Sequence, residues 1–204
     1  MKERPILFRA EMVRAILQGR KTQTRRIVKP EIPAWTKRFG RVTGGGWIAY
    51  MDTMGQGIGH CPYADFPGDR LWVREGWRVG SQDRNTIWYR DNACKVIPES
   101  AEKLAGKSLG DKWKSSIHMY RWTSRIDLEV VSVRIERLQD ISEKDAMAEG
   151  CHSGQFEYKG FPKDGEGTET AVESYQILWE SINGKGSWAL NPWVWVIEFK
   201  RIQG

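Results

Sequence analysis

The sequence GRKTQTRR, residues 19–26, is the stretch around which the rest of the chain is organised. Residues 11–18 precede it with apolar side chains at helical spacing, so Gly19 stands where a left-handed C-terminal cap is expected. Residues 22–28 follow and predict a strand, which Pro30 ends. The stretch therefore links a helix to a strand, and this link contains four cations and two hydroxyls.

The side chains of this link allow two interpretations. Lys21 falls in the predicted turn and Thr24 in the first extended residues, so a lysine that folds back would bring its ammonium near the hydroxyl. A lysine beside a threonine forms a plausible activated pair. The alternative is that the four cations only keep an exposed edge solvated, as runs of charge usually do. From this stretch alone, the second interpretation is favoured.

The length predicts one domain. A chain of 204 residues can bury a substantial core but is short for two, so we interpret residues 1–204 as a single domain with insertions. The region around residues 31–67 is rich in Gly and Pro and shows no sustained periodicity, which predicts a loop that folds over a site or holds a ligand. Two further insertions are predicted at about residues 98–118 and 152–171.

Positive charge is concentrated at the N-terminal end. The chain carries a net charge of +6, whereas residues 1–47 hold 12 Lys/Arg against 3 Asp/Glu, a local excess of +9 that leaves −3 for the rest. A localised basic region favours a phosphate-bearing partner, with nucleic acid or a nucleotide first among the candidates.

The chain contains 11 tryptophans, and aromatic side chains among cations can stack on nucleobases. Trp193 and Trp195 alternate within a strand pattern near the end of the chain, which assigns them to the core. Trp35, Trp47 and Trp113 lie in Gly- or Lys-rich surroundings and are the better candidates for stacking.

The three cysteines, Cys61, Cys94 and Cys151, predict neither disulfides nor a metal site. They show no C-x-x-C spacing, and the adjacent His60 and His152 do not supply the ligand spacing of a zinc site. The sequence shows no secretory signal and no apolar run of transmembrane length. We expect a reduced, cytoplasmic protein with no membrane association, no metal and no cofactor.

The strongest strand signal covers residues 125–137, with a bulge or bend at Val131. Other strands are predicted at residues 6–8, 70–77, 87–89 and 193–202, and a helix at residues 172–182.

A short helix is predicted after residue 141. Ser142 is its expected N-cap, Asp145 occupies a capping-box-like position, and Gly150 ends it. Glu149 falls at the C-terminal end, where the helix dipole disfavours a carboxylate, so this residue is either exposed or held there for a reason.

These features together resemble the ASCH family, whose fold is a PUA-like mixed β-barrel with flanking short helices. The resemblance rests on G-x-K-x-x-T-x-R from residue 19, a Gly-Asp turn into a strand at residue 68, the capped short helix, and the V-I-E-F-K strand from residue 196. It implies an α+β fold to which the long loop insertions are added. The threonine form of the motif is similar to bacterial N4-acetylcytidine amidohydrolases, whose catalytic lysine, threonine and glutamate correspond to Lys21, Thr24 and Glu149.

Three other segments resemble a longer ASCH-like group found in phages and prophages. These segments are residues 60–63, 67–75 and 191–199. The short enzymes have no counterpart of the three insertions, so the resemblance does not fix the substrate.

The resemblance implies an amidohydrolase that removes an acyl group from the exocyclic amine of a cytidine-type nucleobase. Thr24 would attack the acyl carbon or position a water, and Lys21 would assist deprotonation or steady the oxyanion. Glu149 would carry the proton to the leaving amine. We expect the neighbouring arginines to lower the pKa of Lys21.

Two alternatives remain open. The first is a non-catalytic module that binds RNA or a modified base, since fold alone does not decide function. The second is a ribonuclease in which His118 or His60 moves protons. The residues expected to bind substrate or nucleic acid are Arg20, Arg25, Arg26, Trp72, Arg74 and Glu75. For Glu75, pairing with an arginine at a strand end is the competing interpretation.

Overall fold

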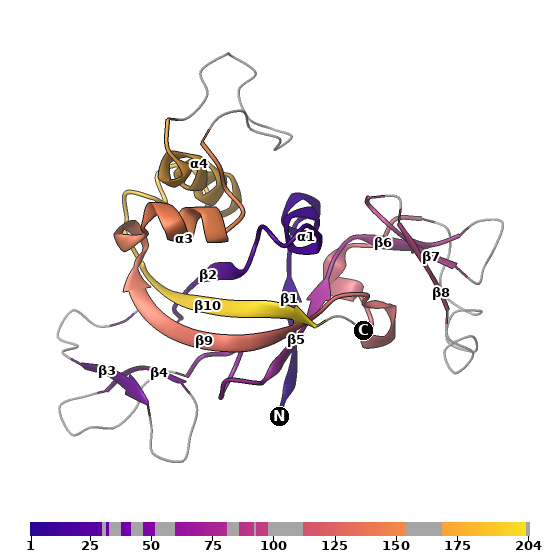
Figure 1. The fold of residues 1–204 in the computed structure, drawn as a ribbon, viewed down its shortest axis with the longest axis horizontal. Coiled ribbons are helices and arrows are strands. Elements are labelled where there is room, and N and C mark those ends of the chain that lie inside the picture. The colour runs from indigo at the N-terminus through magenta and orange to yellow at the C-terminus, as the bar shows by residue number, and fades with distance from the viewer. Residues whose placement is uncertain are drawn as a thin grey trace.

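The computed structural model shows an α+β fold (Figure 1). It describes residues 1–29, 32, 38–41, 47–51, 60–80, 86–91, 93–97, 112–153 and 169–202. The main sheet has five strands in the order β1-β5-β9-β10-β2. Its strands are β1 (Glu3–Leu7), β2 (Gln23–Ile27), β5 (Arg70–Arg74), β9 (Asp127–Arg137) and β10 (Trp193–Ile202). β1 pairs with β5 in parallel, and the other pairs are antiparallel.

The main sheet is open in the part of the chain that the structure describes. β1 and β2 form its two edges and do not pair with each other, so these strands do not close a barrel. The combination of helices with parallel and antiparallel strands confirms the predicted α+β class.

Among the described residues, the helices of the α type that accompany the sheet are α1 (Ala10–Leu17), α3 (Glu143–Ala148) and α4 (Ala171–Asn183). Figure 1 shows α3 and α4 together on one side of the curved β9 and β10 ribbons. Short 3-10 helices η1 (Ser116–His118), η2 (Arg121–Thr123) and η3 (Leu138–Asp140) flank β9 in the sequence. No helix among the described residues is both long enough and apolar enough to cross a membrane.

A pair of strands lies inside the first predicted insertion. β3 (Arg38–Arg41) and β4 (Trp47–Met51) are antiparallel, so the expectation of no regular structure over residues 31–67 is wrong for these two segments. Each strand is only four or five residues long, and the surrounding glycines and prolines conceal such short runs of strand-forming residues. Most of the other two insertions, residues 98–111 and 154–168, lies outside the described residues, as does Trp35.

The predicted bulge in the long strand is confirmed. Glu198 of β10 pairs with Ser132 and the next residue, Phe199, pairs with Val130, so Val131 has no partner in the register. Val131 is 48% exposed, as expected for a residue that a bulge turns away from the core.

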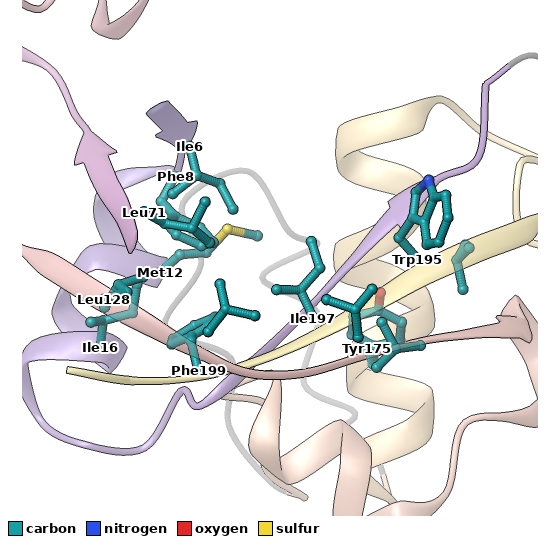
Figure 2. Packing of buried hydrophobic residues seen from close by; sticks show 14 of the residues in the cluster. Ile6, Phe8, Met12, Ile16, Leu71, Leu128, Tyr175, Trp195, Ile197 and Phe199 are labelled. Atoms are coloured by element: carbon teal, nitrogen blue, oxygen red, sulfur yellow. The ribbon is translucent and has the colours of Figure 1, made fainter. Parts of the chain in front are cut away.

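The main core lies between the five-stranded sheet and helices α1 and α4. Figure 2 shows side chains from β1, α1, β5, β9, α4 and β10 in this cluster. Trp195, Ile197 and Phe199 are buried as predicted, whereas Trp193 is partly buried at the margin.

A second, smaller cluster belongs to a three-stranded antiparallel sheet. This sheet consists of β6 (Trp77–Val79), β7 (Thr86–Tyr89) and β8 (Cys94–Val96). Figure 1 shows it at the opposite end of the molecule from α3 and α4. Its buried residues are Trp77, Val79, Ile87, Tyr89, Ile97 and Met119.

Candidate functional site

The turn after α1 is held against the end of α3. Gly19 has φ +73°, the left-handed conformation expected for a C-terminal cap. The backbone N–H groups of Arg20 and Lys21 both donate to the Ala15 carbonyl, at 2.9 and 3.1 Å. Thr22 N then donates to Ala148 O at 2.8 Å, which joins the start of the strand segment to α3.

Gly150 permits the close approach of these two segments. It ends α3 with φ +91°, and a Cβ placed on it would lie 3.1 Å from the Ala15 Cβ and 3.4 Å from the Lys21 Cβ. Ser142 caps the other end of α3, where its hydroxyl oxygen accepts from Asp145 N. The predicted cap and terminator are both confirmed, and together they fix where Glu149 emerges.

Lys21 and Glu149 form a buried ion pair. The Lys21 side chain is fully buried, and its Nζ lies 2.6 Å from Glu149 Oε2. Nζ also donates to Gln23 O at 2.8 Å and to Glu149 O at 3.0 Å. An ammonium has three protons, and these three acceptors use all of them.

Burial lowers the pKa of Lys21 below its ordinary value, while Glu149 opposes this effect. The arginines of the stretch were expected to be the cause. Arg26 does act in that direction, but its influence is smaller than that of burial. The three hydrogen bonds of Nζ place Lys21 as the group that holds Glu149, and Lys21 forms no hydrogen bond with the Thr24 hydroxyl among the described residues.

Glu149 occupies the C-cap of α3, and its side chain is 3% exposed. A carboxylate at this end of a helix is disfavoured by the dipole. Two cations compensate for this unfavourable position: Lys21 Nζ lies 2.6 Å from Glu149 Oε2, and Arg25 Nη1 lies 3.5 Å from Oε1. Two cations thus lie around one buried carboxylate.

Arg25 is a buried hub of ion pairs. Its side chain has no exposed area and contacts carboxylates of Glu136 at 3.1 Å, Asp145 at 3.6 Å and Glu149 at 3.5 Å. Its Nε is buried without a hydrogen-bond partner. Arg25 thus lies neither on a solvated surface nor at a freely accessible phosphate site.

A cavity of about 300 Å³ lies next to this ion-pair cluster. Thr24 and Glu149 both line it, together with Arg25 and Arg26. Thr24 is 3% exposed, and its hydroxyl forms no hydrogen bond with the described residues. Lys21 is absent from the described residues that line the cavity. The others that line it are Met12, Ile27, Lys29, Pro62, Tyr63, Tyr175, Leu178, Trp179, Ile182 and Asn183.

One wall of the cavity comes from α4. Tyr175 projects from this helix, and the Arg25 guanidinium carbon lies 5.9 Å from the centre of its ring. Burial, reinforced by Glu149, raises the pKa of Tyr175 well above its ordinary value, so the phenol stays protonated. Sequence reasoning assigned Tyr175 only to the apolar side of its helix. The sequence did contain one sign of a polar role for Tyr175, because a phenol on a buried helix face needs a polar partner for its hydroxyl.

The other two arginines of the stretch have different surroundings. Arg26 Nη2 donates to Leu7 O, and its guanidinium carbon lies 5.3 Å from the centre of the Phe8 ring. Arg20 Nη1 donates to Gly150 O at 3.2 Å. Only Arg26 of these two lines the cavity, whereas Arg20 is tied to the end of α3.

Three residues expected at the site belong to another region. Glu75 is buried and accepts two hydrogen bonds from Arg125, both at 2.8 Å. This agrees with the competing interpretation, in which Glu75 pairs with an arginine at a strand end. Trp72 is 8% exposed, and the Arg74 guanidinium carbon lies 4.6 Å from the centre of its ring. Among the described residues that line the cavity, none of these three is present.

The histidines considered for a ribonuclease are also elsewhere. His60 and His118 are exposed, and neither belongs to the described lining of the cavity. All three cysteines are free. The described residues contain no group of three or more His, Cys, Asp or Glu side chains that could hold a metal ion.

Comparisons with protein-family models, with curated proteins and with solved structures found no match for this chain.

Proposed function

We propose that this chain is a hydrolase of ASCH type, with a PUA-like core, that removes an acyl group from the exocyclic amine of a cytidine-type nucleobase. The observation that carries the proposal is the shared cavity. The hydroxyl of Thr24, a residue that is 3% exposed, forms no hydrogen bond with the described residues and lines the same cavity as the buried and doubly ion-paired carboxylate of Glu149.

The reaction consumes one water and yields a carboxylic acid and a free amine. Either the Thr24 hydroxyl attacks the acyl carbon, which gives an ester on Thr24 that water then hydrolyses, or it orients a water that attacks the acyl carbon directly. Glu149 accepts the proton of the nucleophile and transfers it to the departing amine nitrogen. Its Oε1 is the more available oxygen for this task, because Arg25 Nη1 contacts it only at 3.5 Å, whereas Oε2 accepts from Lys21 at 2.6 Å.

Lys21 acts as a positioning residue in this proposal. Its three donors all end on Gln23 and Glu149, which orients the carboxylate and leaves no Nζ proton for the substrate. The arginines can stabilise the oxyanion that forms on the acyl oxygen through their positive charge, since Arg25 and Arg26 line the cavity.

The size and lining of the cavity suit a small aromatic substrate. Its volume of about 300 Å³ is at the lower end of the range for small-molecule pockets, about 300–1,000 Å³. Tyr63, Tyr175 and Trp179 provide aromatic surface beside the cations. The same lining also supports a second candidate, a module that binds a modified base without turnover.

The test compares Thr24→Val with the matched variant Thr22→Val. Thr22 is an exposed threonine two residues away and is outside the described lining of the cavity. Each protein is incubated with N4-acetylcytidine, and cytidine is quantified by mass spectrometry. We expect Thr24→Val to lower kcat by about 100-fold or more and Thr22→Val to leave it unchanged.

The two candidates differ in what Thr24→Val changes. In a hydrolase the variant still binds the substrate, since the lost interaction is made mainly in the transition state. A wild-type protein that binds N4-acetylcytidine in calorimetry but releases no cytidine would refute the hydrolase and leave the binding module.

A further inference from the structure

A second surface, separate from the cavity lining, combines aromatic rings, of which that of Tyr120 is exposed, with cations that have no described carboxylate partner. It is built from the segment that contains η1 and η2 and from strands β5, β6 and β7 with the turn that follows. We call it the aromatic-basic face, and it comprises Arg74, Arg78, Arg90, Trp113, Lys114, Ile117, Tyr120 and Trp122. Among the described residues that line the cavity, none of these is present.

The aromatic part of this face is ordered by its own contacts. Tyr120 is 52% exposed and stacks on Trp122, with ring centres 6.0 Å apart and planes 11° from parallel. The edge of Trp77 supports the same ring, at 6.1 Å and 72°. Ile117, 56% exposed, lies three residues away in η1. A planar ring fixed in this way and open to solvent can receive a second planar group.

Cations surround these rings and stack on them. The guanidinium carbon of Arg90 lies 4.0 Å from the centre of the Trp113 ring and that of Arg78 lies 5.2 Å from it. Lys114 Nζ lies 6.0 Å from the centre of the Trp77 ring. Such contacts hold the cations in place while leaving their donors available.

The charge of this face is not neutralised within the part of the chain that the structure describes. Arg74, Arg78, Arg90 and Lys114 form no ion pair with a described carboxylate. The Nε atoms of Arg74 and Arg78 are buried without a hydrogen-bond partner. Neighbouring Arg121 differs, because it is paired with carboxylates of β1 and β9.

Part of the N-terminal charge, where the sequence predicted the basic face, is neutralised by internal pairs. Lys2 and Arg4 share Asp65, at 2.6 and 2.9 Å. Lys21 and Arg25 are buried against Glu149 and its neighbours. These four cations thus already have carboxylate partners, whereas the four cations of the aromatic-basic face have none among the described residues.

We propose that the aromatic-basic face binds single-stranded nucleic acid, with a base stacked on Tyr120 and phosphates held by Arg74, Arg78, Arg90 and Lys114. Stacking requires the open face of a base, which a duplex does not offer, and phosphates complement the unpaired cations. An acidic protein would form ion pairs with the cations, but its carboxylates would not stack on the exposed ring of Tyr120. This inference does not depend on the proposed hydrolysis.

The test is fluorescence anisotropy with a labelled 12-nucleotide uridine RNA, the equivalent thymidine DNA, and a duplex of the same length. We expect both single strands to bind, the duplex to bind more weakly, and Tyr120→Ala to weaken single-strand binding by about 5- to 150-fold. Arg78→Gln/Arg90→Gln should lower the slope of log affinity against log salt by about 1.4. Binding of one single strand alone would assign the face to RNA or to DNA.

Arg14→Gln is the matched control, since Arg14 is an exposed arginine on α1, outside this face. This variant should leave the affinity and the salt slope unchanged, apart from the small effect of losing one distant charge. Circular dichroism of each variant verifies folding. The proposal is overturned if wild-type protein binds neither single strand, or if Arg14→Gln weakens binding as much as the variants of the face. Equal binding of polyglutamate, unaffected by Tyr120→Ala, would also overturn it and would indicate an acidic protein partner.

Discussion

Replacing Lys21 by Met should destabilise the fold more than the loss of a single side chain suggests. The variant removes the cation 2.6 Å from Glu149 Oε2 and leaves a carboxylate that is 3% exposed, with Arg25 at 3.5 Å as its remaining partner. Breaking one partner of a buried ion pair costs about 3–5 kcal/mol, because the other charge stays desolvated. We therefore expect a loss of this size in the free energy of unfolding.

The assay is urea unfolding followed by tryptophan fluorescence and circular dichroism, in a double-mutant cycle with Glu149→Gln. The double variant should lose about 2 kcal/mol less than the sum of the two single variants, since no charge is then left unpaired. Lys200→Met is the matched control, because Lys200 pairs with Glu129 at 2.8 Å but is 62% exposed. It should cost about 1 kcal/mol or less. If Lys21→Met costs no more than Lys200→Met, or if the cycle is additive, the ion pair does not hold the site together.

Two further variants test the surroundings. Gly150→Ala should destabilise the protein by about 1–2 kcal/mol or more, because φ is +91° and the new Cβ would lie 3.1 Å from the Ala15 Cβ; an unchanged urea midpoint would contradict this. Asp69 has a pKa below its ordinary value because three backbone N–H groups donate to it, which outweighs the opposite effect of burial. The stability that this carboxylate contributes is present above its unfolded pKa of about 3.9 and is lost as the pH falls through the lower folded value. The difference in unfolding free energy between wild type and Asp69→Asn should thus be large at pH 7 and shrink below about pH 4, whereas a constant difference would show that the charge is irrelevant.

Local signals in the sequence predicted the elements that present the site. Gly19, Ser142 and Gly150 mark helix ends by rules that act within a few residues, and the structure has these ends where the rules place them. The same holds for the bulge at Val131, where the alternation of buried residues along β9 shifts by one.

Long-range pairings could not be predicted in the same way. The three carboxylates around Arg25 come from β9 and from the first turn and the C-cap of α3, more than a hundred residues away, and no local rule connects them. For this reason the sequence suggested an exposed basic edge where the structure has buried ion pairs. Tyr175 was missed because periodicity reports which face of a helix is buried but not what lies opposite that face.

The position of β2 at the end of its sheet has a consequence for the backbone of the site. Among the described residues β2 pairs only with β10, so the backbone groups of Gln23, Arg25 and Ile27 point away from the neighbouring strand. Gln23 and Arg25 are nevertheless only 1% and 4% exposed, so this edge is covered and not open to water. The Lys21 ammonium donates to the Gln23 carbonyl at 2.8 Å. The side chain that orients Glu149 therefore also satisfies a buried carbonyl at the sheet edge, and its loss would leave that carbonyl without this donor in addition to disturbing the cavity.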